Sequence, residues 1–402
     1  MNFENNLEDM YIKHLSLTNF RNYIRLELDL PSQLTLIQGD NAQGKTNLLE
    51  AIYFLATTRP LHARTDSQLI NWSAQREEMP FARLAADIQR RDAPHRIEIA
   101  LIKMPMPEAA RLHKRIKVDG VERRALDLIG QVNVVIFSPQ DLDLISGPPQ
   151  VRRHYLNATI CQIDPHYCRA LNRYNHILKQ RNYLLRRLQE RRGDPDQLSF
   201  WDKGLIEEGI YLIAQRQEIL TELNELIHGI HLRLTGEQER LHLIYQPSVK
   251  VTADQRITEA FAAQLSQVRA KEMQQGLSLL GPHRDDMCFL VDGVDMNLYA
   301  SRGQRRTIAL SLRLAEMELM RGRTGEQPIL LLDDVMSELD HDRRQHLMAT
   351  ISGDQQAIIT TTDLDRFAPD FLARLRLLMV REGKIEAMTN GQSGLQIADC
   401  NL

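Results

Sequence analysis

One eight-residue motif constrains this chain more than any other feature. It fits the phosphate-binding pattern G-x-x-x-x-G-K-[ST] and reads Gly39-Asp40-Asn41-Ala42-Gln43-Gly44-Lys45-Thr46. Residues 34–37 are predicted to form a buried strand before it, and residues 47–55 carry the apolar spacing of a helix after it. In that setting, backbone N–H groups turn toward phosphates at the helix N-terminus. We expect the motif and Asn47 to bind ATP, with Lys45 on the β/γ-phosphates and Thr46 on Mg²⁺.

A second motif is an apolar strand that ends in two carboxylates. Residues 329–332 are Ile-Leu-Leu-Leu, which suits a parallel strand covered on both faces, and Asp333 and Asp334 follow. We expect Asp333 to hold Mg²⁺ and Asp334 to orient the attacking water as a general base. The alternative is a strand that ends in a solvated acidic turn. Thr362 and Asp363 follow a further strand and are predicted to face the γ-phosphate, because such sheets gather ligand groups at strand carboxyl ends.

A third motif, Ser301-Arg302-Gly303-Gln304, opens a predicted helix. Ser301 and Gln304 have the spacing of a capping box, which is the purely structural interpretation. A second interpretation is functional. It is favoured by the glycine, the flanking arginines and the position before the acidic strand. In it, Ser301, Gly303 and Gln304 contact the γ-phosphate of a nucleotide held by another copy of the chain. The three motifs together predict an ATP-dependent homodimer.

The ordered set of motifs resembles the ABC-type ATPase head of the SMC class and, in finer detail, the RecF family. The resemblance extends over about residues 11 to 385. The strings that carry the closer resemblance are Leu15–Tyr23, Gly39–Ile52, Ser138–Leu142, Gly147-Pro148 with Arg152-Arg153, Gly281–Asp286 and Leu331–Asp340.

The resemblance implies an α/β fold, an ABC-type ATPase head with a mixed sheet plus an inserted antiparallel α-helical arm. It implies that Arg21, Asn22 and Arg59 contact the nucleotide. It also gives Gln140 the role of the Q-loop residue that couples Mg²⁺ and the γ-phosphate to the arm. Two departures stand out: Ala42 occupies a position that is usually glycine, and His62 replaces the second arginine of an R-x-x-R pair.

The family also implies a function. Its members act in DNA replication and recombinational repair, as ATP-driven dimers that clamp DNA near duplex/single-strand junctions and hydrolyse ATP slowly. The implied protein partners are RecR, RecO and RecA. The alternative that we keep open is another SMC or ABC-type ATPase subunit that does not act on DNA.

Composition is compatible with this interpretation but does not establish it. The formal net charge is −3, so DNA binding requires local basic clusters, although basic residues on a helix are usually just a solvated face. Four cysteines lack C-x-x-C spacing, no apolar run approaches a membrane span, and no signal peptide is evident, which favours a cytoplasmic protein. The candidate DNA contacts are Arg115, Arg152, Arg153, Arg186 and Arg187.

We predict four segments along the chain. Residues 1–10 form a disordered acidic tail, 11–145 the first part of the head, 146–278 the helical arm and 279–402 the rest of the head. The short arm argues against a long-armed SMC protein, which needs hundreds of heptad residues. A transporter ATPase has no large helical insert, and a small-molecule kinase does not need the Ser-x-Gly-Gln motif.

Overall fold

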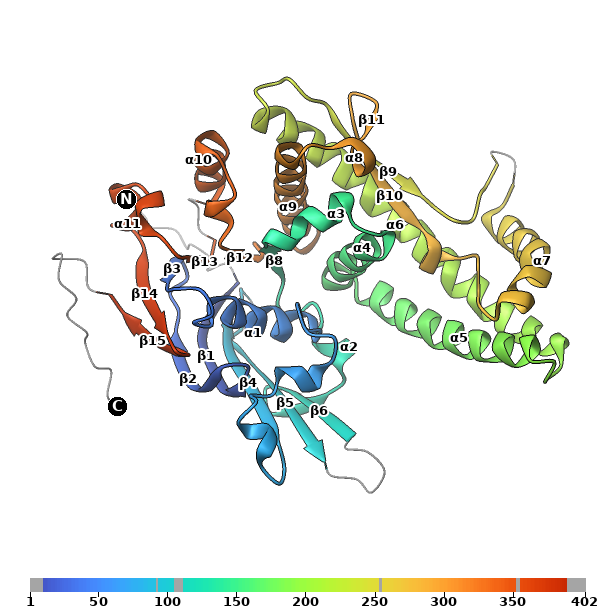
Figure 1. The fold of residues 1–402 in the computed structure, drawn as a ribbon, viewed down its shortest axis with the longest axis horizontal. Helices are drawn as coiled ribbons and strands as arrows, with labels where there is room; N and C mark the ends of the chain where they lie inside the picture. The colour runs from blue at the N-terminus through green and yellow to red at the C-terminus, as the bar shows by residue number, and fades with distance from the viewer. Residues whose placement is uncertain (1–9, 92, 105–110, 253–254, 352–354, 389–402) are drawn as a thin grey trace. The chain divides into compact units, whose positions relative to one another are not determined.

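We describe the chain from a computed structural model, which covers residues 10–91, 93–104, 111–252, 255–351 and 355–388. The chain folds into two compact units (Figure 1). The first unit comprises residues 1–140 and 316–402, and the second comprises residues 141–315. The predicted arm domain begins at residue 146, and the second unit begins at residue 141. The predicted arm domain ends at residue 278, whereas the second unit continues to residue 315. The predicted tail lies outside the described residues except Met10, which is buried.

The first unit contains an antiparallel sheet with the strand order β2-β1-β4-β5-β6-β7. Leu15 and Leu17 of β1 are fully buried, as expected for two residues that share one face of a strand. Its strands are β1 (Tyr11–Phe20), β2 (Tyr23–Asp29), β4 (Phe81–Gln89), β5 (His95–Met104), β6 (Arg111–Val118) and β7 (Val121–Arg123).

The other sheet of the first unit is mixed, with the order β15-β14-β3-β13-β12-β8. All neighbours are parallel except the β14–β15 hairpin. Residues 329–332 of β12 are fully buried, which explains their uninterrupted apolar sequence. The strands are β3 (Leu34–Gln38), β8 (Val134–Phe137), β12 (Ile329–Asp333), β13 (Ala357–Thr361), β14 (Arg376–Arg381) and β15 (Lys384–Ala387).

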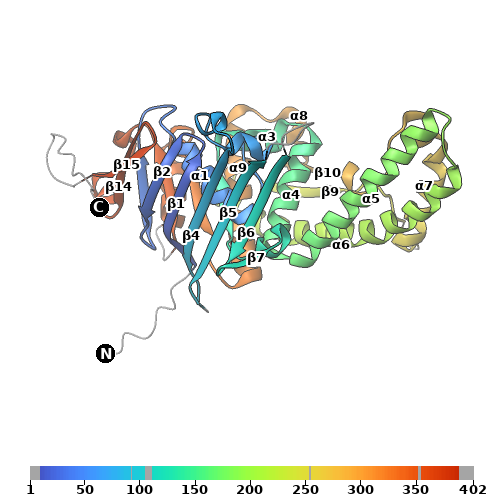
Figure 2. The same cartoon turned by 90° about the horizontal axis from the view of Figure 1, so that it is seen from below.

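Helix α1 (Lys45–Thr57) lies between these two sheets and contacts strands of both (Figures 1 and 2). Nearly all of its residues are buried, whereas the sequence pattern predicted one apolar face. A helix covered on every side must be apolar all round. The other helices of the first unit are α2 (Ala125–Leu128), α10 (His341–Ile351) and α11 (Pro369–Leu372).

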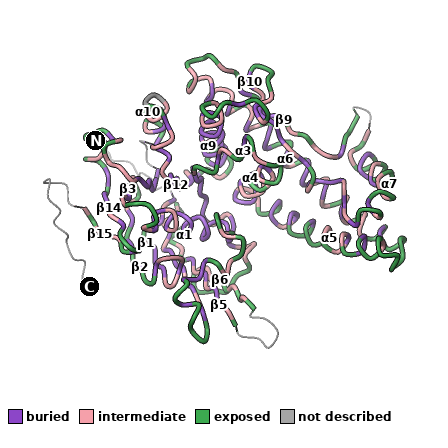
Figure 3. The backbone as a smooth tube through the Cα atoms, viewed as in Figure 1, coloured by how far each residue is buried: buried purple, intermediate pink, exposed green. Residues whose placement is uncertain are grey.

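The second unit combines helices with a three-stranded antiparallel sheet, β11-β10-β9. Helices α5 and α6 form the predicted antiparallel pair, and α7 packs against both. Buried residues, most of them apolar, recur along both helices (Figure 3). The elements are α3 (Leu142–Ser146), α4 (Pro149–Ile163), α5 (Pro165–Gln189), α6 (Leu198–Leu234), β9 (Leu241–Gln246), α7 (Ile257–Gln275), β10 (Asp286–Val291), β11 (Val294–Asp295), α8 (Met296–Tyr299) and the start of α9 (Arg302–Thr324).

The segment Gly281–Asp286 connects several elements of the second unit. Gly281 has φ +127°, and a Cβ there would lie 2.4 Å from the Tyr174 hydroxyl, so only glycine fits. The buried guanidinium of Arg216 lies 3.0 Å from Asp285, and Asp285 also accepts the Ser248 N–H at 2.7 Å. This segment is one of those that carry the resemblance to the RecF family. In the structure it joins α6 to the sheet of the second unit.

Candidate nucleotide-binding site

The phosphate loop is held in a shape that two of its glycines alone permit. Gly44 has φ +115°, and a Cβ there would lie 2.4 Å from the Asn22 amide nitrogen. A Cβ on Gly39 would lie 2.6 Å from the Val380 carbonyl oxygen. Both distances are too short for any larger residue, so the loop backbone lies close against its surroundings.

Asn22 supports the phosphate loop through two hydrogen bonds of its side chain. Its Nδ2 donates to the Gln43 carbonyl at 2.9 Å, and its Oδ1 accepts from Asn47 at 2.8 Å. The buried Tyr23 hydroxyl donates to the Gly44 carbonyl at 3.0 Å. Asn22 was predicted to contact the nucleotide; the structure shows contacts with the loop itself. Asn47 both bonds to Asn22 and lines the cavity described next.

A cavity of about 460 Å³ opens in the first unit beside this loop. The Lys45 ammonium lies within it and donates to the carbonyls of Gly39 and Asp40, the latter at 2.8 Å. Burial lowers the pKa of Lys45, although Asp334, Asp333 and Asp40 oppose that shift. The lining residues are Asn41, Ala42, Gly44, Lys45, Thr46, Asn47, His62, Pro139, Gln140, Asp333 and Asp334.

Thr46 and Asp333 form the most acidic part of this cavity. Thr46 Oγ1 lies 2.9 Å from each carboxylate oxygen of Asp333, which also accepts from Thr360 Oγ1 at 2.9 Å. Hydroxyl and carboxylate oxygens are the ligands that Mg²⁺ prefers, and here they converge from different elements. The predicted donor set therefore fits a magnesium ion.

Asp334, the carboxylate that directly follows β12, also lines the cavity. Its Oδ1 is buried and has no hydrogen-bond partner among the residues that the structure describes. Its Oδ2 accepts from Ser337 at 3.2 Å, and its backbone N–H donates to Thr360 at 3.1 Å. Asp334 has φ +51°, in the left-handed region that aspartate adopts more readily than most residues with a Cβ. Asp334 therefore lines the cavity and carries an unsatisfied acceptor, which is the property that a general base needs.

Gln140 and His62 complete the cavity from other segments. Gln140 follows β8, whose Phe137 is paired in parallel with Leu332 of β12, so both strands deliver polar residues to one edge. His62 also lines the cavity, and its N–H donates to Glu50 at 3.0 Å.

Several predicted nucleotide contacts lie elsewhere. Arg59 is exposed beyond the C-terminus of α1, and the chain returns to the cavity only at His62. Arg21 forms two hydrogen bonds to the fully buried Glu50, at 2.7 and 3.0 Å. Asp363 caps the short turn that follows it by accepting the Asp365 N–H. Neither Thr362 nor Asp363 is among the described residues that line the cavity, and their predicted contact with the γ-phosphate stays a prediction.

The Ser301–Gln304 motif opens α9 within the second unit. Ser301 Oγ accepts from the Gln304 N–H at 3.2 Å, and Gln304 Oε1 accepts from the Ser301 N–H at 3.1 Å. The capping box is therefore real. Ser301 and Gly303 are nevertheless exposed, and among the described residues a Cβ built on Gly303 would meet Ser301 Oγ at 3.9 Å and no nearer side chain. A ligand can approach this turn closely.

The candidate DNA contacts fall into two groups. Arg152 is buried and binds Asp286 through two nitrogens, at 2.7 and 2.8 Å, so its assignment as a DNA contact was wrong. Arg153 is half-buried and donates to the Asp285 carbonyl at 2.7 Å. Arg186 and Arg187 are exposed on α5, and Arg115 is exposed on β6. These three remain candidates.

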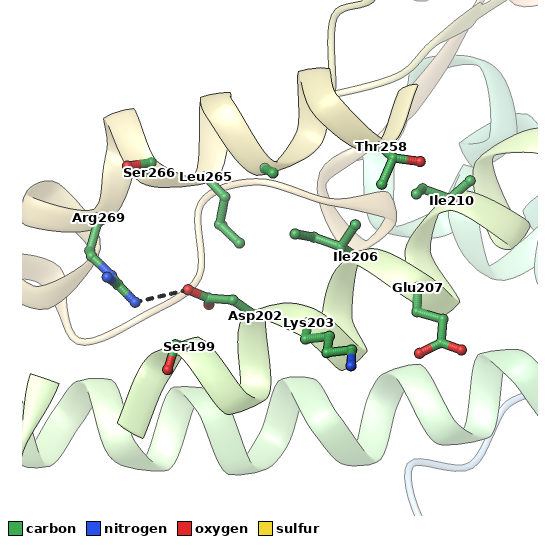
Figure 4. A pocket seen from close by; sticks show the side chains of 11 residues that line it. Ser199, Asp202, Lys203, Ile206, Glu207, Ile210, Thr258, Leu265, Ser266 and Arg269 are labelled. Atoms are coloured by element: carbon green, nitrogen blue, oxygen red, sulfur yellow. Dashed lines mark hydrogen bonds and ion pairs between the residues drawn. The ribbon is translucent and has the colours of Figure 1, made fainter. Parts of the chain in front are cut away.

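A second hollow, of about 780 Å³, lies between α6 and α7 in the second unit (Figure 4). Its lining includes Ile206, Ile210 and Leu265, and Arg269 closes one end through a 3.0 Å contact with Asp202. No sequence motif predicted this hollow. Its lining also carries the charged side chains of Lys203 and Glu207, but none of the three sequence motifs contributes to it.

The comparisons with known proteins agree with this geometry. The family described as "RecF/RecN/SMC N terminal domain" matches residues 11–385. A relative from Chloroflexus aurantiacus, "DNA replication and repair protein RecF", is 46% identical over 94% of this chain and 100% of its own. The chain belongs to the RecF family. A relative from Halalkalibacterium halodurans with the same name is 39% identical, over 94% of this chain and 99% of its own.

Solved structures support the same assignment. "Structure of the recombination mediator protein RecF-ATP in RecFOR pathway" aligns with a TM-score of 0.84 and 32% identity, over 96% of this chain and 100% of that chain. An Smc head from Pyrococcus furiosus aligns with a TM-score of 0.53 and 15% identity, which shows the fold alone. The predicted fold class is thereby confirmed, and the RecF interpretation is favoured over an ATPase that does not act on DNA. Within the described part of the chain, no helix has the length and apolar character needed to span a membrane.

Proposed function

We propose that this chain binds ATP in the cavity of the first unit and uses it to close a homodimer on DNA. One observation carries the proposal: five polar side chains from three separate segments line a single cavity. They are Lys45, Thr46, Gln140, Asp333 and Asp334. The solved relative described above carries ATP in its name, which supports the choice of nucleotide.

Each residue has a role that follows from its position. Lys45 and the loop N–H groups bind the phosphates, and Thr46 and Asp333 would hold Mg²⁺, which when bound neutralises phosphate charge. Asp334 holds the proton acceptor Oδ1 ready for the attacking water, and Gln140 lines the same edge. Hydrolysis serves as a weak reset, because the useful output of such a switch is its bound state.

Dimerisation follows from the exposed turn at Ser301 and Gly303. A helix N-terminus attracts phosphate, and this one has an open side where a second copy can present its nucleotide. ATP then lies in the interface, and its binding stabilises the dimer by mass action.

DNA is the proposed ligand of the closed dimer. The exposed Arg186 and Arg187 suit contacts with a phosphate backbone, and relatives are named for DNA replication and repair. Binding near duplex/single-strand junctions, and cooperation with RecR and RecO in loading RecA in the cytoplasm, are part of this proposal. The family and the named RecFOR pathway of the solved relative support them.

The test is the molecular mass by light scattering with ADP, with ATP, and with ATP plus duplex DNA. We expect ATP to double the mass of the wild type and of a surface control, Lys13→Met. Lys45→Met should lose ATP binding, and Ser301→Arg should bind ATP but stay monomeric. A wild type that binds ATP and stays monomeric in all conditions would replace the clamp with a single-subunit ATPase.

A further inference from the structure

The side chain of Gln304 is oriented by a residue outside its own helix. Its Oε1 accepts the Ser301 N–H, and its Nε2 donates to Glu239 Oε1 at 3.1 Å. A backbone N–H can only donate and a carboxylate only accept, so these partners allow one orientation of the amide. The amide keeps a second hydrogen and a second lone pair for a ligand.

Glu239 is itself fixed from the end of the longest helix. It lies in the loop after α6, and its Oε2 contacts the Nε2 of His231, in the last turn of α6, at 3.2 Å. His231 is fully buried, and its Nδ1 contacts Ser311 Oγ on α9 at 2.9 Å. Ser311 in turn donates to the Thr307 carbonyl one turn earlier. The contacts form a closed path from the signature turn, through α6, back to the signature helix.

We infer that Glu239 is a positioning residue for the signature motif, which sets the orientation in which Gln304 meets the nucleotide of a partner copy. The inference rests on the proposed function, because it assigns Gln304 to the dimer interface. His231 acts through Glu239: it holds the carboxylate toward α9 and thereby links the signature turn to the end of α6. Glu239 does not itself touch the nucleotide in this scheme.

The first experiment needs no dimer. Hydrogen–deuterium exchange of the ATP-free monomer over residues 300–310 should speed up in Glu239→Ala, because the first turn of α9 loses its outside support. Glu237→Ala, which removes an equal charge from an exposed site in the same loop, should leave exchange unchanged. Equal exchange in the wild type and Glu239→Ala would overturn the inference, whether or not ATP drives dimerisation.

The second experiment is a double-mutant cycle on the ATP-dependent dimer. Glu239→Ala should weaken dimerisation at least tenfold, since a hydrogen bond to a charged group is lost at each of two sites. ATP affinity of the monomer should be unchanged, and Glu239→Gln, which keeps an acceptor, should recover part of the loss. Gln304→Ala combined with Glu239→Ala should be no weaker than Gln304→Ala alone. If the losses of dimer affinity in the two single variants multiplied in the double variant, Glu239 would act independently of Gln304. That result would overturn the inference.

Discussion

Thr46 and Asp333 lie 287 residues apart in the sequence, but the Thr46 hydroxyl contacts both carboxylate oxygens of Asp333 at 2.9 Å. Their contact joins the phosphate loop to the acidic strand. The two neighbouring carboxylates differ: both oxygens of Asp333 accept hydrogen bonds, whereas Asp334 Oδ1 has no hydrogen-bond partner in the described part of the chain.

Asp334→Asn should separate ATP binding from hydrolysis. We expect phosphate release to fall about 10²- to 10⁴-fold, because the proton acceptor is lost, while ATP still drives dimerisation. Asp333→Asn should impair both, since it removes a proposed Mg²⁺ ligand. Phosphate release and light scattering measure the two effects. Unchanged hydrolysis in Asp334→Asn would remove this residue from the chemistry.

Arg21→Ala should destabilise the protein by about 3 kcal/mol, because it leaves the charge of Glu50 buried and unpaired. Denaturant unfolding measures this free energy. Arg25→Ala, at an exposed position on β2, is the control and should change it by less than about 0.5 kcal/mol. If Arg21→Ala instead lowered ATP affinity tenfold at unchanged stability, the predicted nucleotide contact would be correct.

His283 should make stability fall as pH falls from 6.5 to about 4. Burial lowers its pKa to about 4, and its two contacts, with the Tyr174 hydroxyl at 2.6 Å and the Ser278 carbonyl at 3.2 Å, suit a neutral ring. Between these pH values His283 is protonated in the unfolded chain and neutral in the folded chain. The free energy of unfolding therefore falls by on the order of 2–3 kcal/mol across this window. His283→Asn should flatten the pH dependence of unfolding. The exposed His113→Asn should not, and equal slopes in all three proteins would refute the assignment.

Ala42→Gly should stabilise the protein. Ala42 has φ +65°, a left-handed conformation that is costly for alanine and accessible to glycine. We expect a gain of about 1 kcal/mol in the free energy of unfolding without ATP. Ala270→Gly, in the exposed interior of α7, should lose about the same amount. A loss at position 42 as well would mean that the loop is not strained there.

The double variant Arg186→Ala/Arg187→Ala should weaken DNA binding and reduce the slope of log affinity against log salt by about 2. Fluorescence anisotropy over a salt series measures both. Arg173→Ala is the control on the same helix, because Arg173 is already paired with Glu208. Arg152→Ala should instead unfold more easily, since Asp286 loses its partner. An unchanged salt slope would remove α5 from the DNA surface.

The sequence predicted what is encoded locally and missed what depends on distant partners. The phosphate loop, the acidic strand and the α5–α6 pair are continuous patterns, and the structure confirmed each as an element. Arg152 looked like a surface cation because nothing near it in sequence reveals Asp286, 134 residues away. Helix α1 is likewise buried on every side because it lies between two sheets. The helical spacing of its own residues does not reveal that environment.

The interruption of the first unit has a consequence for biosynthesis. Strands β3 and β8 are never neighbours: β13 and β12 lie between them, and both follow the inserted unit in the chain. At about 5–20 residues per second, translation from residue 137 to residue 361 takes roughly 10 to 45 s, during which both early strands expose unpaired edges. A ribosome-bound chain that has reached only the second unit carries a phosphate loop but no acidic strand to complete the site.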